Sequence, residues 1–109
     1  MRYFVHLLWI GLLVGCTPKT PPSGGPEVSL ASRGEAVYMA NCIACHNKDP
    51  KLDGPIGPAN HGSSLDLVRA RVLEAKYPPN YKPKRDTKLM QPMPFLKNDI
   101  EALHAFLNE

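Results

Sequence analysis

The sequence predicts an all-α fold, a single small domain of three short helices connected by long loops. Three stretches place apolar residues at helical spacing behind a residue that can cap a helix, which predicts helices at 29–41, 63–76 and 98–107. No stretch shows the sustained alternation of apolar and polar residues that marks a strand. Twelve prolines in 109 residues require much loop, and turn signals place it at 47–62 and 77–94.

The first predicted helix contains a glycine that needs an explanation. Ser29 or Ser32 can cap this helix, and Glu35 follows Ser32 at the spacing of a capping box. Gly34 lies inside the helix, where glycine costs about 1 kcal/mol relative to alanine. Close approach of another backbone is one reason for a glycine at such a position. Tyr38 lies one turn later on the same face.

The second predicted helix, 63–76, begins at a serine. Ser63 is the expected N-cap, and Asp66 follows three residues later. The loop that comes next, 77–94, is unusually long for a compact domain, which favours a function or a ligand that organises it. The apolar residues of the helix lie side by side on one face, as expected for packing against a core: Leu65, Val68, Val72 and Leu73.

The third predicted helix, 98–107, has the clearest amphipathic pattern. Asn98 is the expected cap, and Glu101 completes a capping box. Three short helices bury too little apolar surface for an ordinary core, and domains of this size usually need an additional stabilising group, such as a disulfide, a metal or a cofactor. The apolar face of this helix has four members: Ile100, Leu103, Phe106 and Leu107.

The N-terminus has the pattern of a targeting segment. Arg2 supplies a positive charge, and the apolar run 3–14 is too short to span a bilayer. The run ends at Gly15 and Cys16, a junction that resembles the lipobox of bacterial lipoproteins, in which the cysteine is lipidated and becomes the first residue. We therefore expect 1–15 to be a lipoprotein-type signal peptide. The alternative is an ordinary secretory signal in which Cys16 is incidental.

Residues 16–27 are expected to form the lipidated cysteine and a flexible tether, because they are rich in proline and glycine. The folded domain is then 28–109. These features predict an exported protein that is lipid-anchored to a bacterial membrane, on its periplasmic or cell-surface side. A formal net charge of +3 is mild and does not suggest a nucleic-acid partner.

Cys42, Cys45 and His46 form a C-x-x-C-H motif, the attachment signature of c-type haem. Two thiols three residues apart can each add to one vinyl group of the same porphyrin. The next residue, His46, then lies beneath the iron, where an imidazole nitrogen can bind it axially. The motif therefore predicts one covalent haem c. With Cys16 assigned to lipid, none of the three cysteines is left over.

The cysteine pair has three other interpretations. A thioredoxin-like redox pair needs a βαβ context, which the sequence does not show. A zinc site needs a second pair of ligands, such as C-x-x-C or C-x-x-H, and the chain contains none. A disulfide across two intervening residues closes a loop too short to constrain the chain much. A covalent haem would also supply the additional stabilising group that the small core requires.

The domain resembles the class I cytochrome c family, in its small bacterial form, from about residue 29 to residue 109. Gly34 and Tyr38, followed by the C-x-x-C-H motif, resemble the N-terminal helix of that family. In the family this helix crosses the C-terminal helix closely, and the resemblance implies that Leu103 and Phe106 are its partners here. It further implies the class I fold, in which helices and long loops wrap one covalent haem.

The resemblance also implies partners for the haem. The Gly-Pro pair that ends at Pro58 resembles the one whose proline carbonyl accepts a hydrogen bond from the haem histidine, a contact that would orient His46. Pro55 is a weaker candidate for that role. The family often places a Trp or Tyr on a haem propionate, and Tyr77 or Tyr81 is expected to do so here. The chain departs from the family in having no glycine directly after the motif.

The sixth iron ligand has more than one candidate. Met93 precedes Pro94 and resembles the Met-Pro motif on the distal side of the haem in this family. A thioether is a soft ligand suited to low-spin haem, and proline stiffens the backbone beside it. Met90 lies only three residues earlier and is the alternative. His61 as the ligand, or an open site, is a further possibility.

The expected function is that of a membrane-anchored c-type cytochrome, which carries single electrons between respiratory or dehydrogenase partners and is not itself an enzyme. The alternatives are a haem subunit of a larger oxidoreductase and an open-site haem enzyme or gas sensor. Its oligomeric state is left open. Five basic residues in the long loop form either a solvated surface or a ring that steers redox proteins with acidic docking surfaces: Lys76, Lys82, Lys84, Arg85 and Lys88.

Overall fold

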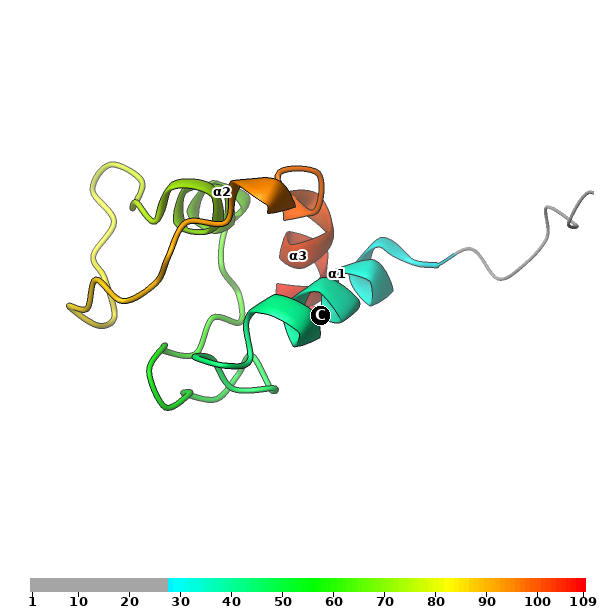
Figure 1. The fold of residues 1–109 in the computed structure, drawn as a ribbon, viewed down its shortest axis with the longest axis horizontal. Coiled ribbons are helices and arrows are strands. Elements are labelled where there is room, and N and C mark those ends of the chain that lie inside the picture. The colour runs from blue at the N-terminus through cyan, green and yellow to red at the C-terminus, as the bar shows by residue number, and fades with distance from the viewer. Residues whose placement is uncertain (1–27) are drawn as a thin grey trace, which may run out of the picture.

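A computed structural model describes residues 28–109 of the chain. Within that range it contains three α-helices, one short 3₁₀ helix and no strand, which confirms the predicted all-α fold. α1 packs against α3, and α2 contacts both α3 and the 3₁₀ helix η1 (Figure 1). The elements follow one another along the chain as α1 (Leu30–Asn41), α2 (Leu65–Glu74), η1 (Pro94–Leu96) and α3 (Ile100–Leu107).

The predicted signal peptide, 1–15, and the predicted tether, 16–27, lie outside the described residues, and Cys16 lies there with them. Within 28–109, no helix is both long enough and apolar enough to cross a membrane.

The crossing of α1 and α3 brings two backbones together at Gly34. A Cβ atom placed on Gly34 would overlap the carbonyl group of Ala102 in α3, so no larger residue fits without a shift of one helix. One turn later, the ring of Tyr38 lies 5.2 Å from that of Phe106, tilted by 52°. Leu103 is buried beside them. The backbone partners of Gly34 are therefore the carbonyl of Ala102 and the nitrogen of the expected Leu103, which would lie 3.0 Å from that Cβ atom.

An ion pair fixes the start of α3, and the predicted capping box is wrong. Arg33 in α1 donates to the Oδ1 atom of Asp99 through Nε at 3.0 Å and through Nη2 at 2.6 Å. Asp99, not Asn98, is the N-cap residue of α3, and no side chain caps its first turn. The reason is that the Asp99 carboxylate is engaged by Arg33, a contact between residues far apart in the sequence.

The other two helices begin at serines. Ser29 caps α1 by accepting from the N–H of Ser32 at 3.0 Å, so the first of the two predicted caps is the one used. Ser64, not Ser63, caps α2 by accepting from the N–H of Leu67. Ser63 instead donates its hydroxyl to Asn60 at 2.7 Å, which removes it from competition for the cap.

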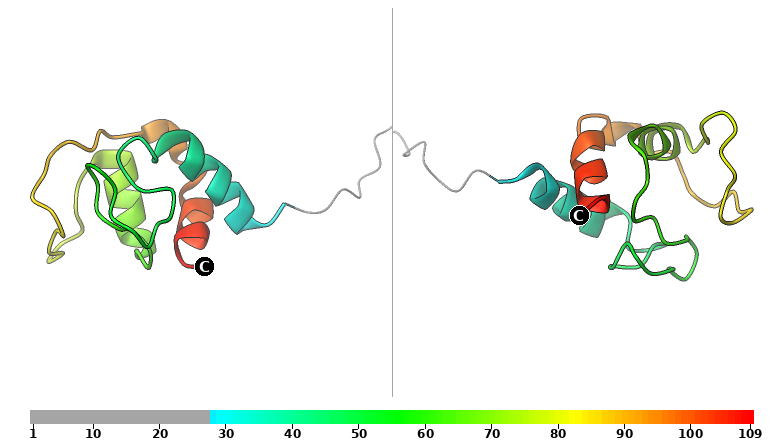
Figure 2. Two further views of the ribbon diagram at one scale, coloured as in Figure 1. Left: turned by 90° about the horizontal axis from the view of Figure 1, so that it is seen from below. Right: turned by 180° about the vertical axis from the view of Figure 1, so that it is seen from behind.

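The two long segments predicted as loops lie on the same side of the α1–α3 pair. In Figure 1 the loop between α1 and α2 lies below the loop that follows α2, and Figure 2 shows the same arrangement from two further directions. The second loop was expected to run through residue 94, but Pro94 begins η1. Proline suits the first position of a helix because its fixed φ is helical and it has no N–H to satisfy.

The buried core of the described domain is small. It consists of Tyr38 from α1, two valines from α2, and residues from η1 and α3. The predicted stripe on α2 is buried at Val68 and Val72, while its other members are only partly buried. Such a core is modest for an independent domain, as expected when another group completes it.

We predict that Gly34→Ala destabilises the domain. The added methyl group meets the Ala102 carbonyl, and overpacking of this kind costs about 1–3 kcal/mol, more than the roughly 1 kcal/mol that alanine gains in helix propensity. The free energy of unfolding of the purified haem protein, measured in urea, should fall. Glu35→Ala at the exposed neighbouring position is the control and should change stability little. Equal or higher stability of Gly34→Ala would contradict the close crossing.

Candidate functional site

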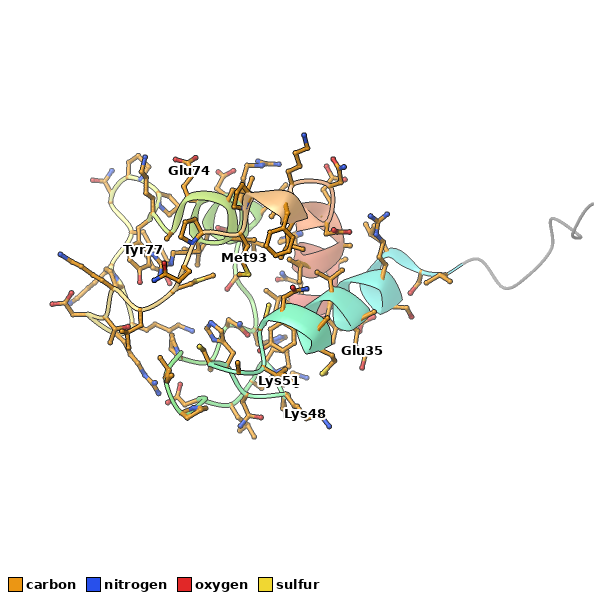
Figure 3. All side chains as sticks on the ribbon, viewed as in Figure 1. Glu35, Lys48, Lys51, Glu74, Tyr77 and Met93 are labelled. Carbon is orange, nitrogen blue, oxygen red and sulfur yellow. The ribbon has the colours of Figure 1, made fainter. Side chains whose placement is uncertain are left out.

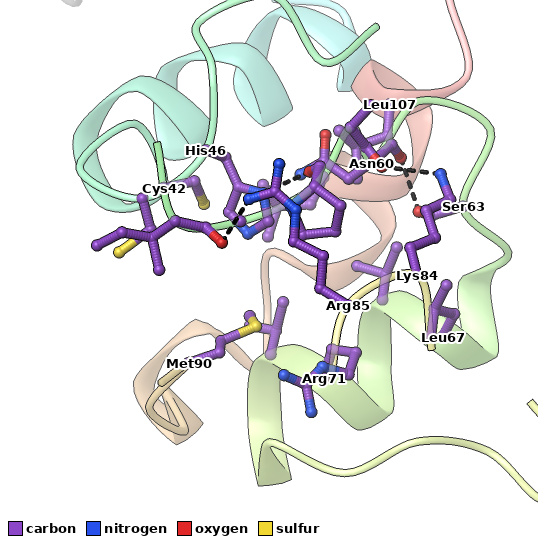
Figure 4. A pocket seen from close by; sticks show the side chains of 18 of the residues that line it. Cys42, His46, Asn60, Ser63, Leu67, Arg71, Lys84, Arg85, Met90 and Leu107 are labelled. Carbon is purple, nitrogen blue, oxygen red and sulfur yellow. Dashed lines mark hydrogen bonds between the residues drawn. The ribbon is translucent and has the colours of Figure 1, made fainter. Parts of the chain in front are cut away.

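A cavity of about 290 Å³ lies between the two long loops, with α1, α2 and α3 at its back. Its inner wall is formed by apolar side chains that also belong to the core, including Val68, Val72 and Leu103. Figure 4 shows this cavity with His46 and Cys42 on one side and Met90 and Arg71 on the other. Most of the predicted site residues line it: Cys42, Cys45, His46, Pro58, Tyr77, Tyr81, Met90 and Met93.

The C-x-x-C-H motif reaches the cavity because α1 ends directly before it. Cys42 is the C-cap of α1 and gives its N–H to Tyr38 at 2.9 Å. The N–H groups of Cys45 and His46 then both bond to the carbonyl of Cys42, at 3.2 Å and 2.9 Å. This tight turn places both cysteines and the histidine on the cavity wall. The two thiols are free and do not form a disulfide.

The imidazole of His46 is held in a defined orientation. Its Nδ1 atom lies 2.9 Å from the carbonyl oxygen of Pro58. A carbonyl can only accept, so Nδ1 carries the proton and Nε2 has the free lone pair that a metal ion requires. Pro55 is exposed and is not the acceptor. Gly57 packs against the ring so closely that a Cβ atom there would overlap the imidazole.

The chain on either side of His46 is fixed by backbone hydrogen bonds and by Tyr38. The N–H groups of Ile56 and Gly57 bond to the carbonyl of Cys45, at 3.2 Å and 2.8 Å. The hydroxyl of Tyr38 donates to the carbonyl of Asn47 at 2.7 Å. Tyr38 therefore packs α1 on α3 and also anchors the residue after the motif, a second role that the sequence did not reveal.

The two candidate methionines differ in how their backbones are anchored. Met93 gives its backbone N–H to the carbonyl of Val72 in α2 at 2.7 Å, and Pro94 begins η1 directly after it. Met90 has no corresponding backbone bond to any residue of 28–109. Figure 3 shows Met93 where the second loop reaches η1, facing the space above the first loop. Both side chains line the cavity and are half-buried.

His61 does not line the cavity with the methionines. Its Nδ1 atom lies 2.9 Å from the carbonyl of Leu107 at the end of α3, and the next residue, Gly62, bonds to the same carbonyl at 2.8 Å. The described structure therefore does not favour His61 as an iron ligand.

Two tyrosines and an arginine form the outer wall of the cavity. The rings of Tyr77 and Tyr81 stack with 5.4 Å between their centroids and only 7° between their planes. The guanidinium carbon of Arg71 lies 4.1 Å above the centre of the Tyr77 ring, an attractive cation–π contact. Arg71 was not singled out from the sequence, because nothing in its neighbours on the helix indicates that it faces a cavity.

The geometry disfavours two other interpretations of the cysteines, a redox-active thiol pair and a zinc site. Burial raises the pKa of the Cys42 thiol to about 11, with the neighbouring Cys45 adding to the effect. Reactive redox cysteines have lowered values instead, because the thiolate is the nucleophile. Within the described part of the chain, no three histidine, cysteine or acidic side chains are grouped as a metal ion would require. The described residues therefore do not offer the ligand set of a zinc site.

The residues present do fit a covalent haem. The cavity offers two thiols, an imidazole with a free Nε2 atom, thioethers across the space and an apolar inner wall. These are the groups that attach a porphyrin, bind its iron and exclude water from its faces. Arg71, Lys84 and Arg85 at the rim supply positive charge suited to carboxylates at the edge of the group.

Comparison with known proteins gives one match. A family model described as Cytochrome c matches residues 31–109, which is most of the chain. No curated protein and no solved structure gave a match.

Proposed function

Because this chain belongs to the cytochrome c family, which binds covalent haem c and transfers electrons with it, we propose that it is a membrane-anchored carrier of single electrons. In this proposal Cys42 and Cys45 attach the haem and His46 binds its iron. Haem c bound there supplies one-electron chemistry, in which the iron alternates between Fe(II) and Fe(III). The observation that supports the proposal most is the contact of His46 Nδ1 with the Pro58 carbonyl, because it leaves Nε2 free.

Met93 is the proposed sixth ligand. Its backbone is fixed to α2 through Val72 and stiffened by Pro94, and both constraints help hold a weak ligand in place. Met90 lines the same cavity without such an anchor and fills space beside it. With both axial positions filled, the site suits electron transfer, whereas an open position would suit an enzyme or a gas sensor.

We predict different spectra for the two methionine variants. Met93→Ala should lose the weak sulfur-to-iron charge-transfer band of the ferric protein and should bind carbon monoxide readily in the ferrous state. Met90→Ala, the matched control, should keep the band and exclude carbon monoxide. The reverse result would assign the ligand to Met90. Retention of the band in both variants would contradict ligation by a single methionine.

Membrane anchoring through a lipid on Cys16 is part of the proposal, and it rests on the sequence before the domain. We predict that the wild-type protein, expressed in a bacterium that processes lipoproteins, is found in the membrane fraction and enters a detergent phase. Cys16→Ser should be released from membranes while keeping its haem stain on a denaturing gel, because Cys16 is not one of the haem cysteines. A wild-type protein that stays in the aqueous phase would contradict the anchor.

Redox proteins with acidic surfaces are the proposed partners. Lys82 and Lys88 are exposed on the second loop, and other residues of that loop, including Tyr81 and Lys84, line the cavity. A second candidate, a haem subunit bound to a fixed partner, is favoured by two large apolar side chains near Met93. Leu89 and Phe95 are 61% and 69% exposed, and they are the apolar side chains that such a partner would cover.

We predict that salt reveals the steering role of the basic loop. Oxidation of the ferrous protein by anionic hexacyanoferrate(III) should slow as ionic strength rises, because salt screens attraction to the basic loop. Replacing Lys82 and Lys88 with Gln should flatten this dependence. The same change at Lys48 and Lys51, which lie on the other loop (Figure 3), removes equal charge and should matter less. A rate that does not change with salt would contradict steering by the basic loop.

A further inference from the structure

The loop 53–59 touches the His46 ring twice and has no regular secondary structure of its own. Gly57 packs on the imidazole, and the Pro58 carbonyl accepts a hydrogen bond from its Nδ1 atom. On the inner side, backbone bonds to the Cys45 carbonyl hold this loop against the motif. Irregular segments with exposed hydrogen bonds open locally at low cost. The outer side of the loop therefore needs contacts of its own if the Pro58 carbonyl is to stay on His46.

Arg85 supplies most of those contacts from the second loop, and the neighbouring Lys84 adds one by donating from Nζ to the carbonyl of Ala59 at 2.8 Å. The Nη1 atom of Arg85 donates to the carbonyl of Ile56 at 2.7 Å and lies 3.4 Å from that of Gly54. Its Nη2 atom is 3.5 Å from a carboxylate oxygen of Asp53. Figure 4 shows the Arg85 side chain reaching across the mouth of the cavity towards the loop that bears His46.

Asp53 closes the other end of the same loop. Its Oδ1 atom accepts from the N–H of Ala59 at 2.8 Å, so one carboxylate holds both Arg85 and the residue after Pro58. The Ala59 bond, with the charges of Arg85 and Lys84, keeps the pKa of Asp53 below its usual range, although desolvation opposes this. At neutral pH the carboxylate is charged and serves as acceptor.

We propose that Arg85 is a positioning residue for His46, with Asp53 as its partner: it holds the loop 53–59 so that the Pro58 carbonyl stays on Nδ1. The guanidinium is suited to this because its planar fork presents several donors at once, whereas a lysine ammonium acts as a single point charge. The inference rests on the proposed function, since it takes His46 to be the iron ligand. It adds a residue of the opposite loop that controls the basicity of that ligand.

A direct effect of the Arg85 charge on the iron is the competing explanation. The two explanations predict opposite changes in the reduction potential when Arg85 is replaced. A cation beside the cavity favours the reduced state, so losing it would lower the reduction potential. The hydrogen bond from Nδ1 to a carbonyl makes the imidazole a more basic ligand, which favours Fe(III). Losing that bond would raise the potential. Arg85→Lys keeps the charge and removes the fork, so only the positioning role predicts a rise.

The experiment measures two properties of the purified haem protein: the reduction potential and, by NMR of the ferrous state, the rate at which the Nδ1 proton of His46 exchanges with solvent. Arg85→Lys, Arg85→Gln and Asp53→Asn should each speed exchange, by about tenfold for loss of a charge-assisted bond. Arg85→Lys should also raise the potential. Lys88→Gln is the control: it removes a charge from the same loop, and none of the described bonds ties it to 53–59.

Two results together would overturn the inference and assign Arg85 a charge role alone. The first is a wild-type exchange rate in the Arg85 and Asp53 variants. The second is a reduction potential that falls in Arg85→Gln and stays constant in Arg85→Lys. If Arg85→Gln fails to fold, Arg85→Lys and Asp53→Asn still decide. A wild-type protein that carries covalent haem without signals from an iron-bound His46 would instead overturn the proposed function, and the inference with it.

Discussion

The crossing of α1 and α3 at Gly34 is the constraint on which the rest of the domain depends. The backbone of α1 lies directly against Ala102, and Arg33 holds the first turn of α3 through Asp99. Because α1 runs without a break into the C-x-x-C-H motif, fixing this helix on α3 also fixes where the motif lies. Tyr38 joins the two roles, since its ring packs on α3 and its hydroxyl holds the chain after the motif.

The same side chains serve as core and as cavity wall. Val68 and Val72 of α2, with Leu103 and Leu107 of α3, are buried among one another and also line the cavity. In the described domain, the hydrophobic core and the wall of the site are therefore formed by the same side chains. A covalently attached apolar group completes its core, which explains how three short helices and two long loops form a stable unit. We therefore expect folding and cofactor attachment to be coupled.

What could be predicted from the sequence were the features set by local pattern: three helices, the loop segments and the C-x-x-C-H motif. What could not be predicted depends on contacts between distant residues. Arg33 engages Asp99, the residue that takes the N-cap position of α3 in place of the expected Asn98, and Arg85 reaches Ile56 in another loop. Gly57 was visible only as part of a Gly-Pro pair. Its own contact with the imidazole follows from the fold of the loop. Side-chain hydrogen bonds between loops leave no periodic signal.

We propose that His46 and a methionine fill both axial positions of one covalent haem, an arrangement that suits electron transfer. The absorption spectrum of the purified wild-type protein in both redox states tests this most directly. We expect low-spin, six-coordinate haem in each state and a weak sulfur-to-iron band in the ferric one. A five-coordinate ferrous spectrum, or ready binding of carbon monoxide by the wild type, would contradict the account.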